Sequence, residues 1–213
     1  MTNMLPGVEL SGEHDAELVA FMNLQQRMKK AKSFPSEAWV NKNQWQLDSE
    51  IYCLAQDWLF LHTGRDCGSE SIHGFKEIRY NDRKSLDFIV RAFPNSKIVI
   101  NYRRNVTAQS NSGFYKKYGD GAKELVNKTS FMLDWASSHP DRARPFALED
   151  FSPDNFTLLF AWLGFPHCYA VSLLHLNKHN KYSRTTELDG GLNGGRTSRV
   201  VCRSDAETGS VAY

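Results

Sequence analysis

The amino-acid sequence predicts an α/β fold in which a parallel β-sheet is flanked by helices. Segments with helical periodicity alternate with short apolar segments of strand character, which is the order that βαβ units require. The clearest strand is KIVINY, residues 97–102, a compact β-branched run of the kind buried in parallel sheets. The 213 residues, 41% of them hydrophobic, suffice for one domain with a substantial core.

Two amphipathic helices are expected in the N-terminal third of the chain. The first spans residues 14–31 and carries lysines in its last turn, where they complement the helix dipole. Pro35 ends that pattern. The second spans residues 47–62, where apolar residues recur three and four positions apart, and Gly64 lies just beyond its end. The first sixty residues are therefore predicted to be helical.

The central segment supplies most of the predicted sheet. A strand near residues 73–79 and a helix over 84–93 lead through a turn at Pro94 into the strand 97–102. A helix is expected to begin at about Asn105. A further helix should span 121–137, with an inward face made of Leu125, Met132, Leu133 and Ala136.

The predicted domain spans residues 1–183, and residues 184–213 form a Gly/Ser/Thr-rich tail. A short strand is expected at 145–148. Ser152 is then a preferred N-cap, Pro153 suits the first helical position, and Gly164 ends the resulting helix. The tail includes GGLNGGRT, Gly190 to Thr197, which fits a phosphate-loop pattern only with Arg in place of Lys. It lacks the flanking strand and helix that such a loop needs, so we interpret it as a flexible segment.

Composition excludes several classes of protein and leaves the compartment open. A net charge of +2 gives no reason to expect nucleic acid as a partner, and no apolar run approaches the roughly 20 residues that span a bilayer. The four cysteines match no zinc motif and are expected to be thiols rather than disulfides, and no metal site is predicted. Three N-x-T sequons, at Asn105, Asn127 and Asn155, favour the Golgi or secretory pathway over the cytoplasm.

The strand 97–102 delivers two arginines, Arg103 and Arg104, to the edge of the sheet where ligands of α/β proteins gather. Guanidinium groups recognise phosphate and sulfate well. If the next helix starts at Asn105, then Asn105, Gln109 and Ser112 share one face, and Arg104 and Ser112 grip one anion together. The alternative is a solvated arginine pair beside an ordinary N-cap.

Three blocks around this strand resemble the sulfotransferases that use 3′-phosphoadenosine 5′-phosphosulfate (PAPS). GFKEIRY (74–80) resembles the strand-end lysine segment of that family. FPNSKIVINYRRNVTAQSNSGFY (93–115) resembles its 3′-phosphate-binding strand, loop and helix, in which an arginine precedes a serine by eight positions. FALEDFSPDNFTLLFAWLGFP (146–166) resembles its later strand and helix, which an acidic residue precedes.

The resemblance implies a P-loop-like three-layer fold and sulfuryl transfer from PAPS to a hydroxyl or amine, such as one on a carbohydrate. It implies that Arg104 and Ser112 bind the 3′-phosphate, with Arg103 and Asn105 in support. Lys76 is then the candidate catalytic cation near the leaving phosphate. Glu77 is a candidate general base, although alternation places it on the opposite face from Lys76, where Arg79 could pair with it.

The sequence departs from that family at its start. The family's phosphate loop, P-[KR]-[ST]-G-[ST]-[ST], cradles the 5′-phosphosulfate, and no such segment precedes residue 70. The first strand and its loop are therefore expected to be missing. The first alternative is a truncated or non-catalytic relative that binds only the 3′-phosphate part of the nucleotide. The second is a relative of the P-loop nucleoside-triphosphate kinases.

Overall fold

The computed structural model describes the following residues: 5–11, 16–31, 44–63, 72–110, 121–172 and 199–203. It is a mixed structure of helices and strands with a small parallel sheet flanked by helices, as the coarse α/β prediction requires. The chain divides into two compact units, one made of residues 9–149 and the other of residues 1–8 and 150–213. The predicted boundary between the domain and the tail, after residue 183, lies outside the described residues.

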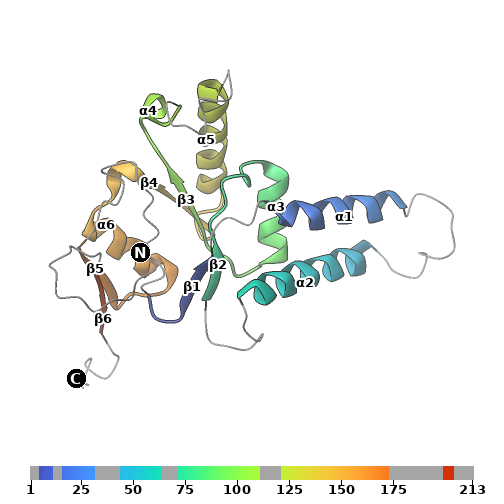
Figure 1. The fold of residues 1–213 in the computed structure, drawn as a ribbon, viewed down its shortest axis with the longest axis horizontal. Coiled ribbons are helices and arrows are strands. Elements are labelled where there is room, and N and C mark those ends of the chain that lie inside the picture. The colour runs from blue at the N-terminus through green and yellow to red at the C-terminus, as the bar shows by residue number, and fades with distance from the viewer. Residues whose placement is uncertain are drawn as a thin grey trace. The chain divides into compact units, whose positions relative to one another are not determined.

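Strands and helices alternate in the larger unit after an antiparallel pair of helices (Figure 1). Its elements in chain order are β1 (Val8–Ser11), α1 (Leu18–Ala31), α2 (Gln44–Thr63), β2 (Ile72–Phe75), α3 (Arg83–Ala92), β3 (Ile98–Tyr102), α4 (Val106–Ser110), α5 (Gly121–Ser137), β4 (Ala143–Ala147) and the 3₁₀ turn η4 (Leu148–Asp150).

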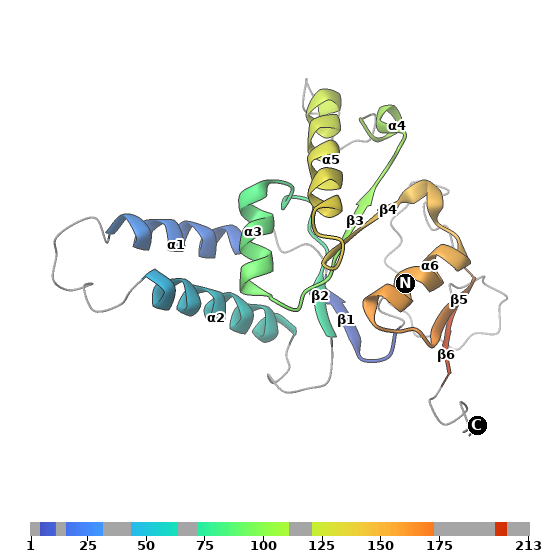
Figure 2. The ribbon, with the colours of Figure 1, turned by 180° about the vertical axis from the view of Figure 1, so that it is seen from behind.

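β3 and β4 form the parallel sheet, in a register that runs from Ile98 opposite Ala143 to Tyr102 opposite Ala147. α5 connects the two strands and packs against both of them, as Figure 2 shows from behind. This arrangement confirms the predicted strand at 97–102 and the helix at 121–137. Buried side chains from α3, both strands and α5 form the core here: Leu86, Ile100, Trp135, Ala136 and Ala143.

The Arg142 side chain holds the start of this sheet against the end of α3. Its Nη2 donates to the carbonyl oxygens of Phe93 at 2.9 Å and Val90 at 3.4 Å, and to Ser96 Oγ at 3.3 Å. Its Nε donates to the Ser96 carbonyl oxygen at 3.2 Å. The last carbonyl groups of a helix have no partner within it, so a guanidinium satisfies several of them at once.

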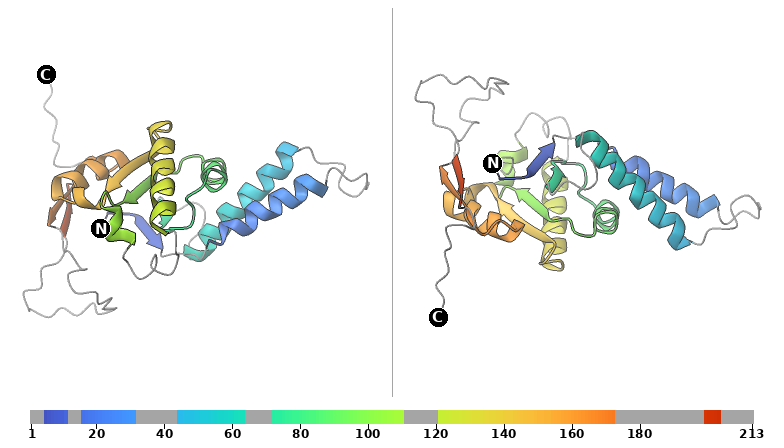
Figure 3. Two further views of the ribbon diagram at one scale, coloured as in Figure 1. Left: turned by 90° about the horizontal axis from the view of Figure 1, so that it is seen from above. Right: turned by 90° about the horizontal axis from the view of Figure 1, so that it is seen from below.

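α1 and α2 lie side by side, as the two views in Figure 3 show, and both contact α3. Gln25 Nε2 on α1 donates to Asp48 Oδ1 on α2 at 2.8 Å, and Lys29 pairs with the same carboxylate at 3.5 Å. Trp58 is partly buried against this core, whereas Trp45 is 75% exposed. The core of the three helices consists of Leu18, Ile51, Ala55, Tyr80, Phe88, Ile89 and Ala92.

The smaller unit contains α6 (Pro153–Leu163), β5 (Cys168–Ser172) and β6 (Arg199–Cys202). Ser152 caps α6 through Oγ, which accepts the N–H of Asn155 at 3.2 Å, as the sequence predicts. Gly164 ends α6 with a φ of 104°, a left-handed conformation that glycine adopts without strain. The N–H of Phe165 then donates to the Phe160 carbonyl oxygen at 2.8 Å, which completes a Schellman motif.

β5 and β6 correct two expectations from the sequence. Arg199–Cys202 lies in the predicted tail but forms a strand that pairs antiparallel with β5. In this pairing Cys202 lies opposite Cys168. These two cysteines form a disulfide bond, so the expectation of thiols is wrong for this pair, while Cys53 is a thiol. Closing 34 residues of chain contributes roughly 3–4 kcal/mol in the chain-entropy model. Cys67 lies outside the described residues.

β1 corrects a third expectation, that the first sixty residues are helical. Val8–Ser11 is a strand paired with β2 in a two-stranded sheet, and α1 follows it. Gly74 on β2 permits this approach, because a Cβ there would lie 2.5 Å from Leu10 Cδ2. The described residues therefore include a strand before α1, and residues 12–15 of the segment that joins the two are outside the described residues. Among the described helices, none combines the length and apolar character needed to cross a bilayer.

Arg142 provides a test of this packing. We expect Arg142→Ala to lower the free energy of unfolding by about 2–3 kcal/mol, because the substitution leaves carbonyl groups of the α3–β3 connection without their charged donor. Urea denaturation monitored by circular dichroism measures the change. Arg91→Ala, at an exposed position near the end of α3, is the matched control and should change stability by less than about 0.5 kcal/mol. Equal effects of the two substitutions would contradict the assigned role.

Candidate anion-binding site at the end of β3

The loop after β3 lies at the carboxyl end of the parallel sheet. Because Tyr102 and Ala147 are register partners, the residues that follow them leave the sheet at the same edge. Arg103 is half-buried and Arg104 is exposed in this loop. η4 follows β4 directly and brings Glu149 to the same place.

Glu149 binds the backbone of the arginine loop. Its Oε2 accepts the N–H of Arg104 at 3.1 Å, and its Oε1 accepts the N–H of Asn105 at 3.2 Å. Two adjacent backbone donors thus converge on one carboxylate, which is the geometry that also binds other oxyanions. These hydrogen bonds, from Arg104 first and then from Asn105, lower the pKa of Glu149, and the Arg104 charge adds to the effect.

α4 begins one residue after the predicted start. The carbonyl oxygen of Asn105 accepts the N–H of Gln109 at 3.2 Å, so Asn105 occupies the position just before the helix. The Oε1 atom of Gln109 is buried, with no hydrogen-bond partner among the described residues. The structure thus brings Arg103, Arg104 and Asn105 together in one loop, whereas Ser112 lies outside the described residues.

Lys76 and Glu77 follow β2, which ends at Phe75 rather than near residue 79. Lys76 is exposed. Glu77 instead turns inward, and its side chain is only 1% exposed. The predicted pairing of Glu77 with Arg79 is confirmed, since Arg79 Nη1 donates to Glu77 Oε1 at 3.0 Å and to Oε2 at 3.2 Å.

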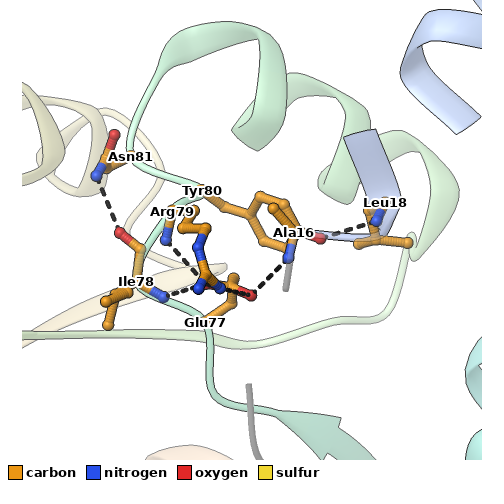
Figure 4. A network of polar contacts seen from close by, with 7 residues as sticks. All are labelled: Ala16, Leu18, Glu77, Ile78, Arg79, Tyr80 and Asn81. Atoms are coloured by element: carbon orange, nitrogen blue, oxygen red, sulfur yellow. Dashed lines mark hydrogen bonds and ion pairs between the residues drawn. The ribbon is translucent and has the colours of Figure 1, made fainter. Parts of the chain in front are cut away.

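Glu77 joins the β2–α3 connection to the start of α1 (Figure 4). Its Oε2 accepts the N–H of Ala16 at 3.0 Å, and its Oε1 accepts the N–H groups of Ile78 and Arg79 at 2.8 and 3.1 Å. Ala16 has a φ of 61°, a left-handed conformation that costs an alanine roughly 1 kcal/mol, and the bond to Glu77 holds it there. The carboxylate therefore fixes the direction in which the chain enters α1.

The pKa values of this network follow from burial and hydrogen bonding. Burial is the largest influence on Glu77 and favours the neutral carboxyl, but the backbone donors and the Arg79 charge together outweigh it and lower the pKa. Burial raises the pKa of Tyr80 to about 12, and nearby carboxylates add to the rise. The Tyr80 hydroxyl oxygen accepts the N–H of Leu18 at 2.9 Å, which provides a second anchor for α1.

A separate hollow of about 370 Å³ lies on the surface of α2 and contains none of the predicted site residues. It is lined by Ser49, Glu50, Cys53, Leu54 and Asp57. Within the described ranges, no group of three or more histidine, cysteine, aspartate or glutamate side chains is arranged to hold a metal ion.

Glu149 is the site residue that the sequence analysis missed. The ALED segment marks an acidic residue after a strand, but the sequence does not show which donors that carboxylate meets. Residues 98–102 pair in parallel with residues 143–147, and this pairing places residues 104 and 149 at the same edge of the sheet. Knowledge of this strand register would have identified Glu149 as a site residue.

Comparisons of this chain with protein-family models, with curated proteins and with solved structures found no match. The chemistry of the site therefore rests on the chain's own residues.

The Glu77 network predicts a specific dependence of stability on pH. Because the folded-state pKa of Glu77 lies below its ordinary value of 4.5, the stabilisation is fully present above about pH 4.5 and is lost as the pH falls through the folded pKa. At pH 7 we expect Glu77→Gln to lower the free energy of unfolding by roughly 2 kcal/mol, and the difference from the unsubstituted chain to shrink at pH 3. Urea denaturation at both pH values measures it.

Glu124→Gln is the control for this experiment, because Glu124 is 58% exposed and pairs only at the surface, with Lys128. A difference for Glu77→Gln that stays constant with pH would contradict the role of the ionised Glu77 carboxylate.

The hydrogen bonds that Glu149 accepts lead to a second prediction, which amide NMR can check. As Glu149 titrates, the amide protons of Arg104 and Asn105 should shift together, with a midpoint below 4.5. In Glu149→Gln that joint titration should disappear. Amide shifts at Arg104 and Asn105 that persist in Glu149→Gln would show that another group holds the loop.

Proposed function

We propose that this chain binds PAPS and transfers its sulfuryl group to a hydroxyl or amine acceptor, such as one on a glycan. The observation that carries the proposal is the loop after β3, where Arg103 and Arg104 stand at the carboxyl end of a parallel strand and two backbone N–H groups already bind a carboxylate. The P-loop-like three-layer fold is part of this proposal, since the described parallel sheet consists of β3 and β4.

The proposed 3′-phosphate site consists of Arg104 and Ser112, with Arg103 and Asn105 in support. Glu149 contributes a negative charge at its edge, but the two guanidinium charges exceed it and leave the loop cationic. By holding the N–H groups of Arg104 and Asn105, Glu149 fixes the backbone from which the Arg104 side chain extends. A fixed backbone lowers the entropy that the arginine loses when it binds phosphate.

In the proposed reaction the acceptor oxygen or nitrogen attacks the sulfur, and the bond from sulfur to the bridging phosphate oxygen breaks. The products are the sulfated acceptor and adenosine 3′,5′-bisphosphate, and the acceptor's proton passes to a base. Lys76 is the proposed cation that stabilises the charge on the leaving phosphate. The surroundings of Glu77 favour an anchoring role over that of the base, because its carboxylate is buried, fully engaged and less basic than usual.

A second candidate, the non-catalytic relative, is favoured by the β1–α1 connection. β1 and α1 have the order in which a phosphate loop is expected, but the residues between them, 12–17, read GEHDAE and contain no lysine or arginine. A segment with three carboxylates and no Lys or Arg side chain is poorly suited to a 5′-phosphosulfate. Such a protein would bind only the 3′-phosphate part of the nucleotide.

Arg104→Ala tests the nucleotide assignment. Isothermal titration with adenosine 3′,5′-bisphosphate should show binding that falls at least about 100-fold in Arg104→Ala, the loss expected when charge-assisted bonds worth ~3 kcal/mol are removed. Arg91→Ala, which removes an exposed arginine of α3, should bind as the unsubstituted chain does. No binding by a folded sample would overturn both candidates.

Transfer of labelled sulfate from PAPS then separates the enzyme from the non-catalytic relative. An active enzyme should sulfate a panel of hydroxyl acceptors, and Lys76→Ala should lower the rate while leaving the affinity for the bisphosphate nearly unchanged. A chain that binds the bisphosphate but transfers no sulfate to any acceptor is the result expected of the second candidate.

A further inference from the structure

The three N-x-T sequons lie in different structural settings, and the side chains of the one at Asn155 are built into the fold. Asn155 Nδ2 donates to the Asp150 carbonyl oxygen at 2.8 Å. Thr157 of the same sequon donates from Oγ1 to the Pro153 carbonyl oxygen at 2.9 Å and accepts the N–H of Ala170 at 3.1 Å. A sugar on Asn155 Nδ2 would place a bulky group at a half-buried position inside this network.

The sequon at Asn105 belongs to the arginine loop. The N–H of Asn105 binds Glu149, and its carbonyl oxygen accepts the N–H of Gln109 in the first turn of α4. A glycan there would stand directly beside Arg103 and Arg104. Asn105 is exposed and the contacts above are those of its backbone, so a glycan is disfavoured here because it would cover the arginine loop.

Asn127 lies on the solvent face of α5. Lys123, Ser130 and Asp134 stand at i−4, i+3 and i+7 from it, on the same side of the helix, and all are exposed. The buried side chains of α5 point the opposite way, toward the core that contains Trp135 and Ala136. A large hydrophilic group on Asn127 would thus extend into solvent without displacing any contact that holds α5.

The disulfide bond supplies independent evidence about the compartment. Cys168 and Cys202 are cross-strand partners in the β5–β6 pair and are bonded to each other. Disulfides of this structural kind form and persist in oxidising compartments such as the endoplasmic reticulum lumen. N-glycosylation takes place in that lumen, so a chain that acquires its disulfide there folds in the compartment where its sequons are also read.

We propose that Asn127 is an N-glycan acceptor and that this chain carries its glycan on the outer face of α5. In the modification Asn127 Nδ2 forms a bond to the anomeric carbon of a lipid-pyrophosphate-linked oligosaccharide. The bond from that carbon to the pyrophosphate oxygen breaks, the lipid pyrophosphate leaves, and the amide nitrogen gives up one proton. The proposal does not depend on the proposed sulfotransferase activity.

The test uses the full chain, directed into the endoplasmic reticulum of a eukaryotic host by an appended cleavable signal peptide. We expect a glycosylated product that peptide N-glycosidase converts to a faster-migrating band. Enzymatic release in heavy-oxygen water followed by peptide mass mapping should mark Asn127. Asn127→Gln and Thr129→Ala should both abolish the mobility shift, whereas Thr129→Ser, which preserves the sequon, should retain it.

Asn105→Gln is the matched control and should leave the shift unchanged. The proposal is overturned if the secreted chain carries no glycan, or if mapping places glycans at Asn105 or Asn155 and not at Asn127. Non-reducing peptide mapping of the same sample should recover Cys168 linked to Cys202. Alkylation of both of these cysteines without prior reduction would overturn the inference about the compartment.

Discussion

The parallel pairing of β3 with β4 is the constraint on which the described larger unit depends. At one end of the pair, Arg142 binds the carbonyl groups between α3 and β3, and at the other, Glu149 binds the N–H groups that follow β3. Arg142 immediately precedes β4 and Glu149 lies in η4 directly after it, and both side chains satisfy backbone groups that a helix or strand end leaves without partners. A register shift of one residue would move both charges away from their partners at once.

Glu77 and Glu149 use the same chemistry in two different environments. Each carboxylate accepts backbone N–H groups at the entry to a helix, Glu77 for α1 and Glu149 for α4. The Glu77 side chain is buried and also forms an ion pair with Arg79, so its position is set by the folded core around Tyr80. Glu149 is exposed, so water and dissolved anions compete for the same donors. The first arrangement suits a permanent anchor, and the second leaves the backbone donors of the loop near solvent.

Much of this fold could be predicted from local patterns, and the remainder depends on pairing between distant residues. The helices α3, α5 and α6 and the strand β3 have strong periodicity or capping residues such as Ser152 and Gly164, which act within a few positions. β1 and β6 have four residues each, too few for a clear pattern, and their partners lie elsewhere in the chain. The Cys168–Cys202 bond and the role of Glu149 follow from strand register, which no local pattern reveals. Arg103, Arg104 and Asn105 could be grouped from the sequence because they are adjacent in the chain. The inward orientation of Glu77 could not be predicted, because it depends on the N–H of Ala16, which is far away in the sequence.

The disulfide between β5 and β6 changes what a single cut in the backbone can do. Residues 173–198 connect the two strands, and the bond between Cys168 and Cys202 spans the same interval covalently. One peptide bond hydrolysed anywhere in that interval yields two chains that stay linked through sulfur. A proteolysed molecule would keep its original mass, apart from one added water, until a reductant separated the pieces. The glycine-rich segment GGLNGGRT lies within this interval of sequence, so a cut there would leave β6 attached through Cys202.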